Sequence, residues 1–217
     1  MNRLAIIVLM VATGLSADAH GAPGTGDIAG TVLVNGKQPG AGVVVYLEGF
    51  YGVPAPARDH AVIRQREKQF DPPLTVVVRG TTIDFPNEDR VFHNVFSISQ
   101  AARFDFGLYK SGTSKSVEMK RSGAVDVYCN IHPDMVAKVK VVDNAHYTIT
   151  DEHGRFRLQG VPAGDVPLVA WVPSGEQATL TVTVKAGGVA TVKLDVVAVA
   201  RKPTHTRKDG TPYGRYN

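Results

Sequence analysis

The sequence predicts an all-β protein that contains two β-sandwiches. Short runs rich in valine and threonine recur along its 217 residues, and 22 glycines and 13 prolines supply turns between them. No run has helical periodicity beyond a single turn. The spacing of the runs changes near residue 60 and again after residue 144, which divides the chain into three segments.

The first residues have the pattern of a secretory signal peptide. A short basic start, Met1-Asn2-Arg3, precedes an apolar run at 4–15, and Ala17-Asp18-Ala19 has the small residues of a cleavage site. A run of this length rises only about 18 Å as a helix and cannot span a membrane core of about 30 Å. We expect residues 1–19 to be removed, or cleavage after Ala22, and a periplasmic or otherwise exported protein without a membrane span.

The middle segment is predicted to be a small Greek-key β-sandwich. Turn signals such as Pro72-Pro73, Arg79-Gly80 and Ser111-Gly112 separate eight short runs with strand character. So many strands in about 84 residues are typical of a sandwich. We expect the strands at 61–66, 74–78, 81–85, 91–98, 104–109, 114–119, 124–128 and 135–142.

The first and third segments contain further strands. Residues 26–34 alternate in polarity, Asn35-Gly36 marks a tight turn, and 43–47 is a second, more continuously apolar strand. After residue 144, two alternating runs suggest half-buried strands. We expect strands in the third segment at 147–150, 155–158, 166–171, 178–184 and 189–197.

The end of the chain is basic. Residues 201–217 carry five basic side chains against one acidic one, Asp209, and this difference accounts for the whole formal charge of +4. Short basic tails are usually solvated. We therefore expect residues 200–217 to form a disordered tail that binds no nucleic acid.

The single cysteine lies in a pattern with chemical meaning. Cys129, His132 and Met135 follow one another at intervals of three residues, directly after a predicted strand. Two histidines and a cysteine with a weak axial methionine form the blue-copper ligand set, and thiolate and thioether favour Cu(I) while imidazole also suits Cu(II). A zinc site is one alternative, although it would seldom use methionine. A buried, inert cysteine is another.

His93 is the best candidate for the missing histidine, because it lies between two predicted strands. Residues 85–96 and 128–142 resemble the cupredoxin family, and the short Cys-x-x-His-x-x-Met loop is most similar to the amicyanin type. The resemblance implies one type 1 copper, held by Nδ1 of His93 and His132, the sulfur of Cys129 and, axially, Met135. It also implies that Asn94 ties the His93 loop to the Cys129 loop by hydrogen bonds.

The outer segments carry a second resemblance. Residues 150–158 and 161–164 are similar to the carboxypeptidase regulatory-like, or transthyretin-like, β-sandwich, whose first strands are matched by residues 29–47. We therefore expect a cupredoxin domain at 58–144, inserted into an outer sandwich made of 26–50 and 145–199. The alternative is a tandem arrangement in which 26–50 extends the copper domain. The same combination resembles exported proteins named for methylamine utilisation.

These features predict an electron carrier and not an enzyme, because no coordination position for a substrate is evident. We expect redox proteins to dock near His132, whose loop should reach the surface. Copper delivery and a structural or adhesive role are the alternatives.

The outer sandwich shows no paired carboxylates, nucleophile or metal cluster, so scaffolding or docking is expected. The remaining histidines near turns are expected to be exposed: His60, His146, His153 and His205.

Overall fold

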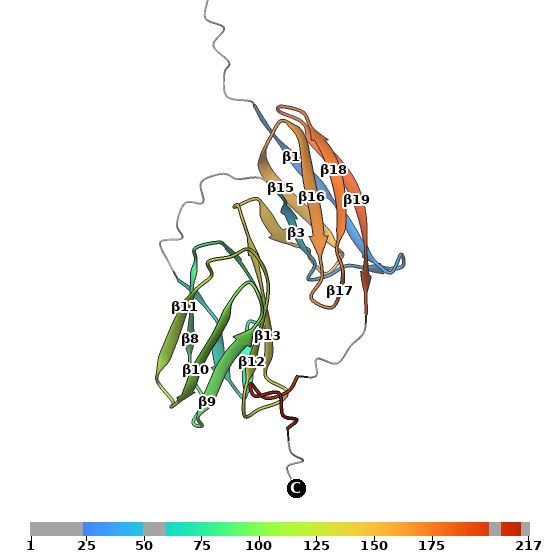
Figure 1. Ribbon diagram of the computed structural model, residues 1–217. Coiled ribbons are helices and arrows are strands. Elements are labelled where there is room, and N and C mark those ends of the chain that lie inside the picture. The colour runs from blue at the N-terminus through green and yellow to red at the C-terminus, as the bar shows by residue number, and fades with distance from the viewer. Residues whose placement is uncertain (1–23, 50–59, 200–204, 214–217) are drawn as a thin grey trace, which may run out of the picture.

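The computed structural model describes residues 24–49, 60–199 and 205–213. Every regular element in these ranges is a β-strand, which confirms the all-β prediction. None of the described residues belongs to a helix that could cross a bilayer. The predicted signal peptide and both cleavage sites lie outside the described residues. Figure 1 shows two β-sandwiches, one above the other.

The outer sandwich is built from both ends of the chain. One sheet has the strand order β15-β1-β19-β17, with β2 paired to β1, and the other has the order β14-β3-β16-β18. Its strands are β1 (Thr25–Val34), β2 (Gln38–Pro39), β3 (Val44–Leu47), β14 (Tyr147–Ile149), β15 (Arg155–Pro162), β16 (Gly164–Trp171), β17 (Gly175–Glu176), β18 (Ala178–Val184) and β19 (Val189–Ala198).

Strand pairing joins the first segment of the chain to the third. β1 pairs with β15 on one side and runs parallel to β19 on the other. β3 lies between β14 and β16. Residues 25–47 therefore share both sheets with residues 147–198, which is the strand arrangement that an insertion requires and a tandem arrangement does not.

The inner sandwich is formed by the chain between these two parts. A five-stranded sheet, β10-β9-β12-β13-β7, faces a three-stranded sheet, β11-β8-β4, and β5 and β6 form a separate hairpin. The strands are β4 (Ala61–Val62), β5 (Arg64–Arg66), β6 (Gln69–Asp71), β7 (Leu74–Val78), β8 (Thr82–Pro86), β9 (His93–Ile98), β10 (Arg103–Tyr109), β11 (Ser114–Glu118), β12 (Gly123–Cys129) and β13 (Val136–Val142). The chain crosses between the sheets after β7, β8, β10 and β11, as in a Greek-key sandwich.

One predicted strand is divided. The run at 61–66 is interrupted at Ile63, which is fully buried in the inner core, so that β4 joins the small sheet while β5 turns back as a hairpin with β6. The hairpin turn is made by Glu67 and Lys68 with φ angles of 54° and 58°. This left-handed conformation is typical of Gly or Asn. Because neither residue is present, no turn signal marks this position in the sequence.

A small apolar cluster joins the sandwiches. Side chains of β3 alternate between the outer core, which takes Val45 and Leu47, and this cluster, which takes Val44 and Tyr46. Val142 from the inner sandwich completes it together with Val169 and Trp171. Burial on both faces explains why the predicted strand at 43–47 is apolar throughout.

A buried lysine occupies the same junction. The Nζ atom of Lys140 lies 4.7 Å from the ring centroid of Tyr46 and 5.2 Å from that of Trp171. Burial lowers the pKa of Lys140, and only the carboxylate of Glu48 opposes this effect. Cation–π contact with two rings compensates part of the desolvation cost.

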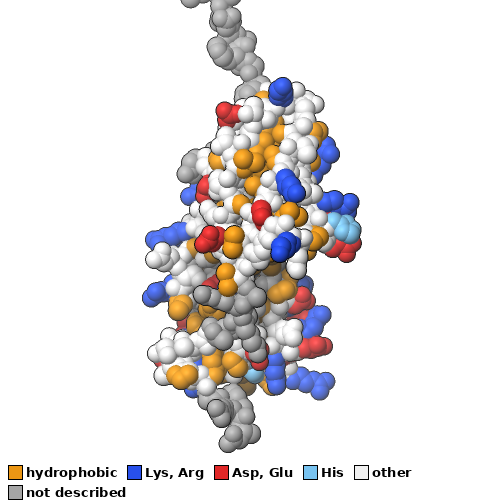
Figure 2. All heavy atoms as spheres, turned by 90° about the vertical axis from the view of Figure 1, so that its right-hand side faces the viewer, with side chains coloured by type: hydrophobic (Ala, Val, Ile, Leu, Met, Phe, Trp, Pro, Cys, Tyr) orange, Lys and Arg blue, Asp and Glu red, His pale blue; other side chains and the backbone are white. Residues whose placement is uncertain are grey.

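Apolar side chains also gather on the surface of the outer sandwich, on the face that Figure 2 shows. The exposed apolar residues of the outer sandwich include Leu180 on β18 and Val189 and Val197 on β19. Single exposed apolar residues are common on protein surfaces and carry no functional conclusion here.

The prediction of a disordered basic tail is wrong for residues 205–213. His205 stacks on Tyr128 of β12, with ring centroids 4.2 Å apart and an interplanar angle of 24°. Lys208 forms an ion pair with Asp105 of β10 at 2.6 Å. The prediction considered only the charge of the tail, whereas its aromatic side chains find apolar partners on the inner sandwich.

Candidate metal centre

The candidate ligands come from two adjacent strands and one loop. His93 is the first residue of β9 and Cys129 the last of β12, and these strands pair with Cys129 opposite Val95. His132 and Met135 lie in the loop between β12 and β13. Adjacent strand ends therefore bring His93, which is distant in sequence, beside the three candidate ligands that are close in sequence.

Backbone hydrogen bonds hold this loop in a tight turn. The N–H of Met135 donates to the carbonyl of His132 at 3.2 Å, and the N–H of Cys129 donates to the carbonyl of Met135 at 3.3 Å. The N–H of Asn130 donates to the carbonyl of Asn94 at 3.0 Å, which fastens the loop to β9.

Asn94 links the two ligand segments in a way that the resemblance did not specify. Its backbone carbonyl makes the contact with the Cys129 loop. Its side-chain amide instead donates to Asp105 on β10 at 2.7 Å. Replacing the side chain would thus disturb β9 and β10 more directly than the loop.

Three donor atoms converge on one point. Nδ1 of His93 and Nδ1 of His132 are 3.1 Å apart, and they lie 3.7 Å and 3.5 Å from the sulfur of Cys129. A triangle with these sides has a circumscribed circle of radius about 2.0 Å, which is close to the usual distances from a first-row metal to nitrogen and sulfur. Among the described residues, these three form the only such group of His, Cys and acidic side chains.

The remaining candidate, Met135, lies in the same buried cluster as Cys129. His93, Cys129 and Met135 are all 0% exposed, whereas His132 is half-buried. Burial lowers the pKa of His132, and the nearby His93 and Lys68 lower it further. The site is therefore shielded on three sides, and one imidazole edge reaches the surface.

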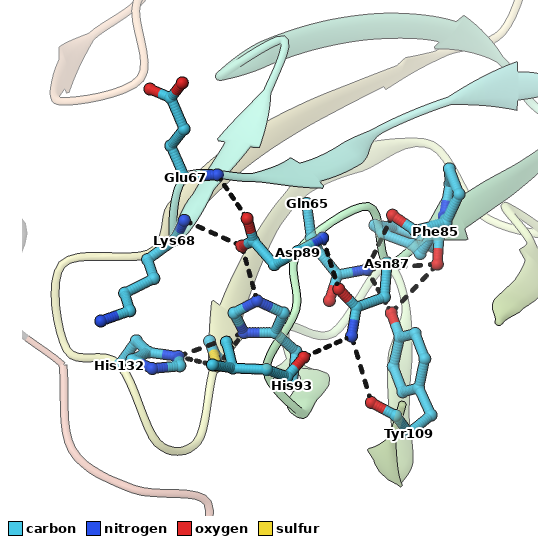
Figure 3. Close-up of polar contacts among 12 residues, drawn as sticks. Gln65, Glu67, Lys68, Phe85, Asn87, Asp89, His93, Tyr109 and His132 are labelled. Atoms are coloured by element: carbon cyan, nitrogen blue, oxygen red, sulfur yellow. Dashed lines mark hydrogen bonds and ion pairs between the residues drawn. The ribbon is translucent and has the colours of Figure 1, made fainter. Parts of the chain in front are cut away.

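A carboxylate orients the buried histidine. Nε2 of His93 donates to Oδ2 of Asp89 at 2.8 Å, so Nδ1 keeps its lone pair and faces Cys129. Figure 3 shows Asp89 on one side of the His93 ring and His132 on the other. A hydrogen bond of this kind fixes the tautomer that a metal ligand needs.

The carboxylate of Asp89 is itself held by the hairpin turn. It accepts hydrogen bonds from the backbone N–H groups of Glu67 at 2.6 Å and Lys68 at 2.9 Å. Burial, the largest single effect, raises the pKa of Asp89, but the hydrogen bonds from Lys68, His93 and Glu67 together hold it below its usual value. The unusual φ angles of the turn aim both N–H groups at one side chain, and Figure 3 shows this arrangement.

Buried polar side chains support the segment before His93. Nδ2 of Asn87 donates to the carbonyls of Val91 at 2.8 Å and Tyr109 at 3.2 Å, and its Oδ1 accepts from the N–H of Asp89 at 3.0 Å. Gln65 donates to the hydroxyl of Tyr109 at 2.5 Å. Sequence reasoning missed Gln65, Asn87 and Asp89, because none has a spacing that marks it as part of the site.

The other described histidines do not belong to the group of converging donors. His60 is exposed and pairs with Asp84 at 3.0 Å, and His153 is exposed beside Glu152, as expected. His146 is half-buried, and His205 is half-buried in the stack on Tyr128, so the expectation of exposure is wrong for these two.

Comparison with known proteins finds similarity to solved structures only. No protein-family model and no curated protein matches the chain. A reduced Cu(I) form of an amicyanin mutant is 25% identical, covering 39% of this chain and 84% of its own, with a TM-score of 0.36. A purple cupredoxin from Nitrosopumilus maritimus is 25% identical, covering 37% of this chain and 98% of its own, with a TM-score of 0.34.

A copper-containing nitrite reductase from Thermus scotoductus SA-01 is 21% identical, covering 39% of this chain and 23% of its own, with a TM-score of 0.38. TM-scores this low carry no conclusion about function.

Proposed function

We propose that this chain is a type 1 copper protein that transfers single electrons between redox partners. The convergence of the two Nδ1 atoms and the sulfur carries the proposal, because one central point lies about 2.0 Å from all three donors. Two imidazoles, one thiolate and a nearby thioether form the donor set that suits copper in both oxidation states. When bound, copper would supply a centre that alternates between Cu(I) and Cu(II).

The protein's own groups keep this centre nearly unchanged between the two states. Strands β9 and β12 fix His93 and Cys129, and Asp89 fixes the tautomer of His93. The hydrogen-bonded loop fixes His132 and Met135. A frame held on all sides needs little rearrangement when the charge changes, which favours fast electron transfer over catalysis.

We also propose that the protein is an electron carrier and not an enzyme. With His93, Cys129, His132 and Met135 as ligands, the protein supplies a complete set of four and leaves no open position for a substrate. His132 is the half-buried member, so redox partners would dock at its edge. Two exposed apolar side chains adjoin the His93 segment: Phe92, the residue before His93, is 56% exposed, and Leu108, opposite Asn94 on the neighbouring strand, is 64% exposed. Such side chains suit the brief contacts of redox partners. Export also belongs to the proposal, on the pattern of residues 1–19.

The test is the visible absorption spectrum of the purified full chain with Cu(II). A thiolate–Cu(II) bond should give an intense charge-transfer band, and Cys129→Ser should abolish it. A colourless wild type, or a Cys129→Ser protein with the same band, would refute the assignment. If the wild type stays colourless and keeps one bound zinc per chain after Cu(II) is added, the site is a zinc site instead.

A further inference from the structure

The C-terminal segment, residues 205–213, lies against the metal loop. Figure 1 shows it in dark red at the end of the inner sandwich that is farther from the outer sandwich. The preceding strand, β19, belongs to the outer sandwich, so the chain returns to the inner sandwich after completing the outer one. What this segment touches there determines which surfaces of the copper centre a partner can reach.

Its polar contacts involve residues that belong to the ligand loop or adjoin it. The hydroxyl of Tyr213 donates to the carbonyl oxygen of Cys129 at 2.6 Å. The N–H of Lys208 donates to Oδ1 of Asn130 at 2.9 Å. Nζ of Lys208 donates to Asp105, whose other carboxylate oxygen accepts the side-chain hydrogen bond of Asn94. The segment is therefore bound directly to Cys129 and Asn130 and, through Asp105, to Asn94 beside His93.

Its aromatic contacts cover the residue before the cysteine. The ring of His205 stacks on Tyr128, and Tyr213 lies edge-on to His205 with ring centroids 5.1 Å apart. Phe96, on the adjacent strand β9, contacts both Tyr128 and His205 at centroid distances of 5.7 Å and 6.3 Å. Four rings thus form a continuous layer over this side of β12.

This layer lies on one of the two short routes from the thiolate to the surface. One route leads through the metal to His132, whose edge is half-exposed. The other leads along the covalent chain from Cys129 to Tyr128, the residue bonded to it. An electron partner could use the second route only by contacting the ring of Tyr128, which is half-buried, and His205 stacks on one face of that ring.

We propose that the C-terminal segment covers the Tyr128 face and confines electron exchange to the His132 end of the centre. This inference rests on the proposed copper function and adds the surface through which electrons enter and leave the centre. The segment acts as an insulating cover that excludes partners from one face, and the other face remains as the docking surface.

The test measures how strongly a charge at the His132 end controls the reaction. Pro133→Glu places a negative charge beside His132, and Pro133→Gln is its uncharged control. The copper protein, reduced to Cu(I), is oxidised by ferricyanide, a trivalent anion, at low ionic strength. If His132 is the only route, repulsion at about 7 Å in water should make the Glu variant about 20-fold slower than the Gln variant.

The same pair of variants is then compared in a His205→Ala background, which exposes the ring of Tyr128. The second route should now carry part of the reaction, so the ratio of the Gln to the Glu rate should fall below about fivefold. His153→Ala, which removes an exposed histidine of the outer sandwich, is the matched control and should leave the ratio near 20-fold.

A ratio that stays near 20-fold in the His205→Ala background could arise if Tyr213 moves onto Tyr128. A chain that ends after Val199 has neither ring and decides this point. A ratio near 20-fold in that chain would overturn the proposed cover, as would a truncated chain that no longer binds copper, since the segment would then serve to hold the loop. Absence of the charge-transfer band in every variant, including wild type, would instead refute the copper function.

Discussion

The carboxylate of Asp89 should lower the reduction potential of the centre. It lies 2.8 Å from Nε2 of His93, and the imidazole ring and one metal–nitrogen bond then separate it from the metal by about 7 Å in all. At an effective dielectric constant of about 20, one charge at this distance interacts with another by about 2.4 kcal/mol. Because about 1.4 kcal/mol corresponds to 59 mV for one electron, Asp89→Asn should raise the potential by about 100 mV.

The substitution should also cost stability. An asparagine cannot accept all three hydrogen bonds that Asp89 receives from Glu67, Lys68 and His93, because its amide nitrogen is a donor. The loss of one hydrogen bond to a charged group should lower the free energy of unfolding by about 1.5–3 kcal/mol. Denaturant unfolding of the metal-free protein measures this effect separately from the potential.

The assay is spectroelectrochemical titration of the charge-transfer band at neutral pH. Asp27→Asn is a suitable control, since Asp27 is also a carboxylate with hydrogen bonds, to Arg157 and Gly160, but belongs to the outer sandwich. Its potential should equal that of wild type. If Asp89→Asn keeps the charge-transfer band but changes the reduction potential by less than about 20 mV, the carboxylate of Asp89 does not lower the potential as its position predicts.

Further outcomes can be checked on the same material. Met135→Gln should retain copper but lower the reduction potential, because an oxygen donor favours Cu(II); an unchanged potential would remove Met135 from the axial position. A chain of residues 58–144 alone should fold and bind copper, and 26–50 joined to 145–199 by a short linker should give a cooperative thermal transition; an unfolded joined chain beside a folded 145–199 would favour the tandem arrangement. Thermal stability should decrease as the pH falls below 3.8, because hydrogen bonds, chiefly from the backbone of Arg155, lower the pKa of Asp151 in the folded state and this contribution is lost on protonation. Asp151→Asn should show a weaker pH dependence in the same melting curves, and an equal one would exclude this carboxylate.

The parts of the centre that are close in sequence were predictable, and the parts that depend on backbone geometry were not. Cys129, His132 and Met135 stand at fixed intervals after a strand, so their convergence follows from local sequence. Asp89 reaches His93 only because the hairpin turn aims two N–H groups at it. That turn has left-handed residues that are neither Gly nor Asn, so composition could not indicate it.

The fold shows the same division between local and distant information. Short runs with strand character and the turn signals between them predicted most strands correctly, including β3, whose continuous apolar run is explained by burial on both faces. The C-terminal segment was judged by its charge, although its contacts depend on two rings, His205 and Tyr213. Their partners on the inner sandwich, Tyr128 for His205 and the carbonyl of Cys129 for Tyr213, are about 80 residues away in sequence, and no local pattern connects them.

The pairing of β3 with β14 has a consequence for the order of folding. Tyr46 in β3 pairs with Tyr147 in β14, so the two ends of the chain between them, which forms the inner sandwich, lie side by side. In an unfolded chain, bringing these strands together means closing a loop of about 100 residues, which costs about 2 kcal/mol more than closing one of about 10. An inner sandwich that folds first brings its two ends together and reduces the loop to its short connections. The outer sandwich, whose β1 must also find β19 at the far end of the chain, would then assemble on a template that is already folded.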